Sequence, residues 1–172
     1  MTMIRILQYP DPRLGTVAEK VTEFGDALQK IIDDMVETLY KTENCAGLAA
    51  TQLDFENPQA ISVMDHTPDK KGLVVVVNPE VIEQEGEVCE PEGCMSIGGN
   101  TYLAVPRAEK VKVRALDRLG KAFELEADGF QAKLLQHEID HLNGIIFIDK
   151  LSRLKRSRVD ARIKKWQKQQ DE

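Results

Sequence analysis

Two histidines and a glutamate lie close together in the chain, as His137, Glu138 and His141. Residues four apart on an α-helix share one face, so both imidazoles can bind a single metal ion. Glu138 stands beside the first histidine, where a carboxylate can hold a metal-bound water and accept its proton. The chain has only three histidines, so a chance pair around a glutamate is a poor explanation. The segment therefore predicts a catalytic metal site.

A third protein ligand is needed, because a catalytic metal site usually takes three and leaves one position for water. The few carboxylates after His141 have no suitable context. Cys94 is the better candidate, since it follows Glu92-Gly93 in a turn-like segment. A thiolate with two imidazoles is a sound set for a divalent metal. With three cysteines in all, a disulfide framework is not expected.

The composition predicts one soluble domain covering residues 1–172, with 42% hydrophobic and 30% charged residues. No run approaches the roughly 20 apolar residues that cross a bilayer, and the first residues contain no signal-like stretch. We therefore expect a cytoplasmic protein that binds neither membrane nor DNA.

Charge is distributed unevenly along the chain. The formal net charge is −6, yet residues 150–172 carry +6. Such a basic end suggests contact with a polyanion, and a solvated amphipathic helix is the alternative. The basic residues are Lys150, Arg153, Lys155, Arg156, Arg158, Arg162, Lys164, Lys165 and Lys168.

The elements that must position these residues follow from apolar periodicity. Helical spacing predicts helices over residues 24–40, 129–142 and 151–170. Alternating or β-branched runs predict strands over 60–64, 73–78, 81–90, 111–116 and 122–126. Because the strands are clustered between helices and do not alternate with them, the predicted fold class is α+β.

Three short motifs resemble those of peptide deformylases, in family order and at about family spacing. They are Cys-Ala-Gly-Leu-Ala-Ala-Thr-Gln at 45–52, Glu-Gly-Cys-Met-Ser at 92–96 and His-Glu-Ile-Asp-His at 137–141. The opening segment 7–14 also looks like the start of the family, so the likeness covers nearly the whole chain. It implies small antiparallel sheets packed around a central helix that carries the two histidines, with a C-terminal helix.

The resemblance also implies the reaction, which is hydrolytic removal of the N-formyl group from the formylmethionine of newly synthesised peptides, with release of formate. The family metal is usually ferrous iron, one per chain, and zinc, nickel or cobalt can substitute. Metal-bound hydroxide attacks the formyl carbon, with Glu138 as general base and then general acid. The Gln52 side chain and the Met95 backbone N–H are expected to stabilise the resulting oxyanion.

The substrate of the family lies extended beside Gly47, with its methionine side chain in an apolar pocket. By the same resemblance, the basic helix 151–170 is similar to the C-terminal helix with which bacterial enzymes bind the ribosome. The remaining residues expected to line the substrate pocket are Glu92, Gly93, Ile97, Lys133 and Leu134.

The chain departs from the family pattern at several positions. Cys45 replaces a glycine of the first motif, where a side chain could narrow the cleft or place a second thiol near the metal. Gly98-Gly99 stands where a proline is usual, in a segment one residue longer that lacks a familiar arginine. Lys133 stands where an apolar, pocket-facing residue is expected. These departures suggest an altered substrate preference.

Two rival functions are compatible with a metal site. A zinc endopeptidase would cleave internal peptide bonds and would not need Cys94. A non-catalytic, ribosome-associated metal-binding protein would need a closed site with four ligands, and Cys45 is the obvious fourth. The presence of Glu138 and Gln52 argues against the second reading, because neither is needed merely to bind a metal.

Overall fold

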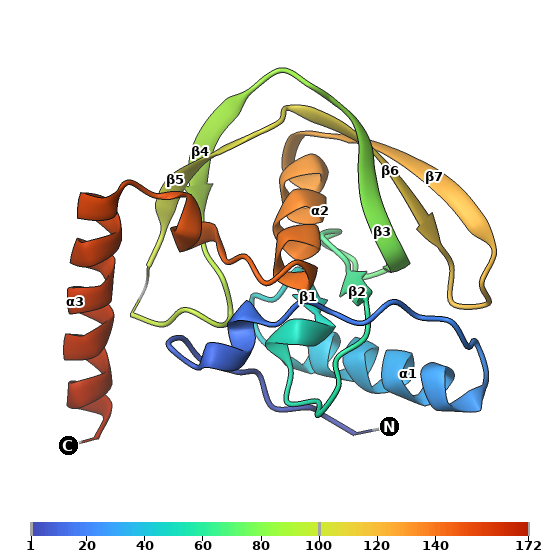
Figure 1. Cartoon of the computed structure of the whole chain (residues 1–172), viewed down its shortest axis with the longest axis horizontal. Helices are drawn as coiled ribbons and strands as arrows, with labels where there is room; N and C mark the ends of the chain where they lie inside the picture. The colour runs from blue at the N-terminus through green and yellow to red at the C-terminus, as the bar shows by residue number, and fades with distance from the viewer. Residues whose placement is uncertain (1, 100, 172) are drawn as a thin grey trace.

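The structure, a computed structural model, describes residues 2–99 and 101–171. Its main sheet has five antiparallel strands in the order β1-β2-β3-β6-β7, and β4 and β5 form a separate antiparallel pair. The helix α2 lies between these sheets, and the helix α3 stands at one edge of the molecule (Figure 1). This arrangement confirms the α+β prediction of small antiparallel sheets around a central helix, followed by a C-terminal helix.

The observed helices have nearly the bounds that the sequence pattern predicts. The helices are α1 (Asp26–Lys41), α2 (Gly129–Leu142) and α3 (Arg153–Gln170). Short 3-10 turns cover Pro12–Gly15, Ala50–Gln52 and Phe147–Lys150. The strands are β1 (Gly47–Ala49), β2 (Ile61–Met64), β3 (Val74–Glu85), β4 (Val88–Glu92), β5 (Leu103–Arg107), β6 (Lys110–Leu116) and β7 (Ala122–Asp128).

The predicted strands at 73–78 and 81–90 were divided in the wrong place. Residues 74–85 form one long strand, β3, whose register with β6 shifts between Val77 and Glu80, and residues 88–90 of the second predicted strand belong to β4. The true break comes at Gly86, whose φ of +72° is the left-handed conformation that glycine adopts without strain. The chain then turns into β4, which leads directly to Cys94.

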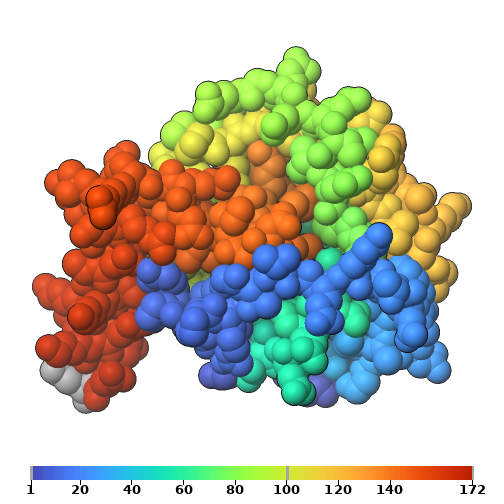
Figure 2. Space-filling view, in the orientation of Figure 1, coloured from blue at the N-terminus to red at the C-terminus, as the bar shows by residue number. Residues whose placement is uncertain are grey.

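Three apolar clusters fill the interior. The first lies between α1 and the β1–β3 part of the sheet, and the second lies between α2 and the sheet. The third joins α3 and the N-terminal segment to the chain around Cys94. Figure 2 shows the N-terminal segment, in dark blue, lying against the C-terminal helix, in red. Among the described residues, no helix is long and apolar enough to cross a membrane.

Candidate metal centre

The helix α2 carries the two histidines and the glutamate on its buried side. His137, Glu138 and His141 are 8%, 2% and 1% exposed. The apolar residues of the same helix, including Leu135 and Ile139, pack in the cluster beneath the sheet and fix the rotation of the helix. The polar side chains are consequently held in the interior, where removal from water makes their mutual interactions strong.

Cys94 follows β4 and approaches α2 so that three donor atoms converge. The Cys94 Sγ lies 3.4 Å from the His141 Nε2, which lies 3.1 Å from the His137 Nε2. All three donor atoms lie within 4.8 Å of one another. A tetrahedral site with bonds of about 2.0–2.3 Å places neighbouring donors roughly 3.3–3.7 Å apart. The donor set therefore fits one small divalent metal ion.

Glu92 orients the His137 ring by contacting the ring nitrogen that faces away from the donor cluster. Its Oε1 lies 2.9 Å from the His137 Nδ1, and its carboxylate also accepts two hydrogen bonds from the buried Arg107, which in turn pairs with Asp140. Burial alone would raise the pKa of Glu92, but the bonds from His137 and Arg107 lower it to about 2. The ionised carboxylate holds the proton of His137 on Nδ1 and leaves Nε2 free to bind a metal.

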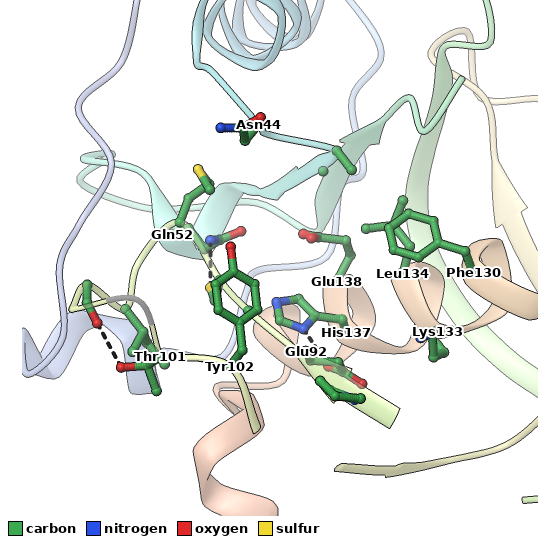
Figure 3. Close-up of a pocket in the computed structure, with 18 of the residues that line it drawn as sticks. Asn44, Gln52, Glu92, Thr101, Tyr102, Phe130, Lys133, Leu134, His137 and Glu138 are labelled. Carbon is green, nitrogen blue, oxygen red and sulfur yellow. Dashed lines mark hydrogen bonds and ion pairs between the residues drawn. The ribbon is translucent and has the colours of Figure 1, made fainter. Parts of the chain in front are cut away.

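Gln52 reaches the same point from the 3-10 turn that follows β1. Its Oε1 accepts the Ala49 N–H at 2.9 Å, which fixes the orientation of the amide. Its Nε2 lies 3.1 Å from the Ser96 Oγ and 3.5 Å from the Cys94 Sγ. A buried side-chain amide thus directs its N–H donors at the candidate donor cluster (Figure 3).

Glu138 has a buried oxygen without a hydrogen-bond partner among the described residues, its Oε2. Burial raises the pKa of Glu138 to about 7. Gly47 lies directly against this carboxylate, since a Cβ at position 47 would stand 2.9 Å from the Glu138 Oε1. An unpaired buried carboxyl oxygen calls for an explanation, and a water or substrate in the cleft would supply its partner.

A cleft of about 410 Å³ opens over these side chains. In Figure 3, Gln52, Glu138 and His137 lie in the middle of the residues that line it, with Thr101 on one side and Phe130 on the other. The residues predicted for catalysis or substrate binding that line it are Gly47, Gln52, Glu92, Gly93, Met95, Ile97, Lys133, Leu134 and Glu138. His141, the third candidate donor, does not line the cleft.

Two aromatic side chains of the cleft were not anticipated. Tyr102, 64% exposed, lies over Gly93, where a Cβ would stand 2.5 Å from its ring. Phe130 is one of the apolar residues of the predicted helix 129–142; it lies in the first turn of α2, is 54% exposed and lines the cleft. A helical pattern cannot tell an apolar residue facing a core from one facing a cleft.

Two of the departures from the family pattern have local explanations. Lys133 bonds Glu90 at 2.5 Å and lies 5.8 Å from the Phe130 ring centre, so its charge is paired at the cleft wall. Cys45 packs in the core beside α1, and it neither lines the cleft nor joins the donor cluster among the described residues. Burial raises the pKa of its thiol to about 12. The closed four-ligand site with Cys45 is therefore not supported.

Comparisons with known proteins agree with this geometry. The sequence model of the polypeptide deformylase family matches residues 3–157. The chain is 60% identical over 167 residues to peptide deformylase 1 of Coxiella burnetii, covering 97% of this chain and 98% of the relative. It is 49% identical to the peptide deformylase of Chromobacterium violaceum over 98% and 99% of the two chains. The crystal structure of a peptide deformylase from Legionella pneumophila superposes with a TM-score of 0.91 at 44% identity, covering 99% of this chain and 98% of that one.

Proposed function

The chain belongs to the polypeptide deformylase family, and from that membership we propose which of its residues perform the reaction. It is a metal-dependent hydrolase that removes the N-formyl group from formylated nascent peptides. We assign metal binding to Cys94, His137 and His141, and we treat residues 1–172 as one catalytic domain. The observation that carries the assignment is the convergence of these three donors beside Glu138, whose Oε2 is unpaired among the described residues, where Cys94, His137 and Glu138 line the cleft.

The metal, when bound, supplies Lewis-acid chemistry, because it lowers the pKa of a coordinated water into the neutral range. Glu138 performs the proton transfers. A carboxyl group whose pKa is about 7 can accept a proton from the attacking water and return it to the departing amine at neutral pH. Its buried, unpaired Oε2 supports this double role. The products are formate and a free amino terminus.

Stabilisation of the developing oxyanion falls to preorganised N–H donors. The Gln52 amide is locked by Ala49 and Ser96, so it needs no reorganisation during the reaction. The Met95 backbone N–H is the second donor in our proposal, on the cleft segment beside Cys94. The peptide lies along Gly47 in β1, which is the edge strand of its sheet and can pair with an extended chain.

Replacing Gln52 by Leu should lower kcat/KM for formyl-Met-Ala-Ser by about 10²–10³-fold, the usual cost of one oxyanion donor. Leucine fills a similar volume but cannot donate a hydrogen bond. The measurement is formate release by protein samples that each contain one metal ion per chain. Gln169→Leu, at an exposed position of α3, is the matched control and should behave as the wild type. Equal activity of the two variants would remove Gln52 from the mechanism.

We propose ferrous iron as the resident metal, with zinc, nickel or cobalt able to occupy the same ligands. A thiolate with two imidazoles accepts each of these ions, so the donor set supports the proposal without selecting among them. Activity after anaerobic loading with each ion in turn separates them, and ferrous iron should give the fastest formate release.

We also propose that the protein works in the cytoplasm and that the outward face of α3 binds the ribosome. Arg162, Lys165 and most other basic residues of this helix are exposed, and the helix lies at the edge of the molecule (Figure 1). Binding to phosphates by such a surface releases counterions and is therefore sensitive to salt.

Co-sedimentation with bacterial ribosomes should show binding that weakens steeply between about 50 and 200 mM salt. With the double substitution Arg162→Glu and Lys165→Glu, no protein should sediment with the ribosomes at about 200 mM salt. Lys70→Glu with Lys71→Glu makes the same charge change in a distant exposed turn and serves as the control. If both pairs reduce binding equally, only general charge matters and the assignment to α3 fails.

A further inference from the structure

One face of the C-terminal helix is packed against the rest of the molecule. The residues of α3 that are buried or half-buried recur at helical spacing, whereas their neighbours are exposed. Among them, Val159 and Ile163 join the apolar cluster that includes Ile97 of the cleft and, at its margin, the metal-ligand candidate Cys94. The full set is Arg156, Val159, Asp160, Ile163, Trp166 and Gln167.

Trp166 makes the contact nearest to the cleft. A Cβ at position 98 would lie 2.3 Å from the indole Cη2 and 2.4 Å from its Cζ3, and one at position 99 would lie 3.5 Å from its Cγ. Contacts below 3 Å cannot be accommodated without movement. The indole therefore rests on the backbone of Gly98-Gly99, in space that a side chain at position 98 would fill.

The opposite side of the same segment lines the cleft. Gly98, Gly99 and Tyr102 all belong to the lining, whereas Trp166 does not. Only a thin layer of backbone thus separates the indole from the substrate space. The segment begins two residues after Ser96, whose hydroxyl accepts a hydrogen bond from the Gln52 side chain.

A second contact ties α3 to the segment through Tyr9. The Tyr9 N–H donates to the Ser96 carbonyl at 2.7 Å. The Gln167 side chain donates to the Tyr9 carbonyl at 2.8 Å, and the Tyr9 hydroxyl donates to Asp160 at 2.5 Å. The helix therefore holds both ends of a short unit that runs from Ser96 to Gly99.

We infer that Trp166 is a positioning residue for the reaction, and that α3 sets the shape of the cleft wall formed by Gly98, Gly99 and Tyr102. This inference rests on the proposed function and extends it. It also accounts for the Gly98-Gly99 pair, because the indole and the two glycines are complementary in shape. The same helix would then serve the ribosome on its exposed face and the substrate on its packed face.

Replacing Trp166 by Ala should raise KM for formyl-Met-Ala-Ser by about tenfold, within the range of coupling between contacting residues. The kcat and the metal content should stay near wild type, because Trp166 touches none of the reacting groups. Trp166→Phe should restore most of the KM, since a smaller aromatic ring still covers the glycines. Gln169→Ala, exposed on the same helix, is the control. A KM unchanged in Trp166→Ala, or a fall in kcat alone, would overturn the inference.

A double-mutant cycle with Gly98→Ala tests the contact itself. In the wild type, the added methyl group must displace the indole, so KM should rise about fivefold. In the Trp166→Ala background the space is empty, and the same substitution should change KM by less than about twofold. If Trp166→Ala does not fold, the rise in KM caused by Gly98→Ala alone still tests the contact, because this substitution removes no buried apolar surface. Additive effects of the two substitutions would contradict the proposed contact.

The failure of this inference can be told apart from a failure of the proposed function. If the wild type releases no formate from formyl-Met-Ala-Ser, the proposed function itself is wrong. If the wild type is active and the double-mutant cycle is additive, the reaction stands and only the role of α3 is withdrawn. Circular dichroism and metal content of each variant confirm that the fold and the metal site are intact.

Discussion

Replacement of Glu138 by Gln should reduce kcat for formate release by about 10²–10⁴-fold, which is the usual contribution of a general acid–base group. Glutamine keeps the size of the side chain but can neither accept nor return the proton. The Glu138 carboxylate that this change removes is buried, has an unpaired Oε2 among the described residues and belongs to the cleft lining. The other buried carboxylate of the lining, Glu92, is already bonded to His137 and Arg107. The measurement is formate release from formyl-Met-Ala-Ser under saturating substrate.

The control for this substitution is Glu85→Gln, which makes the same chemical change at an exposed position of β3. Metal content should remain at one ion per chain in both variants, because Glu138 is not among the proposed ligands. A Glu138→Gln enzyme within about tenfold of wild type would mean that another group moves the proton.

Cys94→Ala should lose both the metal and the activity. Loss of an outer-shell partner already lowers metal affinity by about 10–100-fold, so loss of a direct ligand should lower it by more than about 100-fold. The expected result after dialysis is a metal content far below one ion per chain, with formate release falling in parallel. Metal analysis and the activity assay are made on the same samples.

Cys89→Ala is the matched control, since Cys89 is exposed in β4 and lies outside the donor cluster. Cys45→Ala should likewise keep the metal. A Cys94→Ala protein that retains its metal would fit an endopeptidase-type site that does not use the cysteine. Loss of metal in Cys45→Ala would instead point to a closed structural site.

The helices could be predicted from the sequence because their signals are local. The segment 129–142 has apolar residues at helical spacing throughout, and α2 occupies that range. The short strands β1 and β5 gave no such signal. The strand β1 has only three residues, Gly47–Ala49, and β5 contains Pro106, so neither shows a clear alternation of apolar and polar residues. Their pairing depends on partners distant in the chain.

The candidate site was predictable to the extent that its residues fall in contiguous motifs. His137 and His141 are four residues apart, so their spacing alone indicates a shared helix face, and Glu138 stands next to the first of them. Arg107 gave no such indication, because its partners are 15 and 33 residues away. The contact of Trp166 with Gly98 likewise joins two segments that only the tertiary fold brings together. Neither residue of such a pair carries a local sign of its distant partner.

The most direct test of the account is formate release from formyl-Met-Ala-Ser by the full chain loaded anaerobically with ferrous iron. We expect one equivalent of formate per peptide, no cleavage of the internal peptide bonds, and loss of the activity on removal of the metal. The product peptide, identified by mass spectrometry, should be Met-Ala-Ser with a free amino terminus. A chain that holds one metal ion per molecule on Cys94, His137 and His141, yet releases no formate, would contradict it.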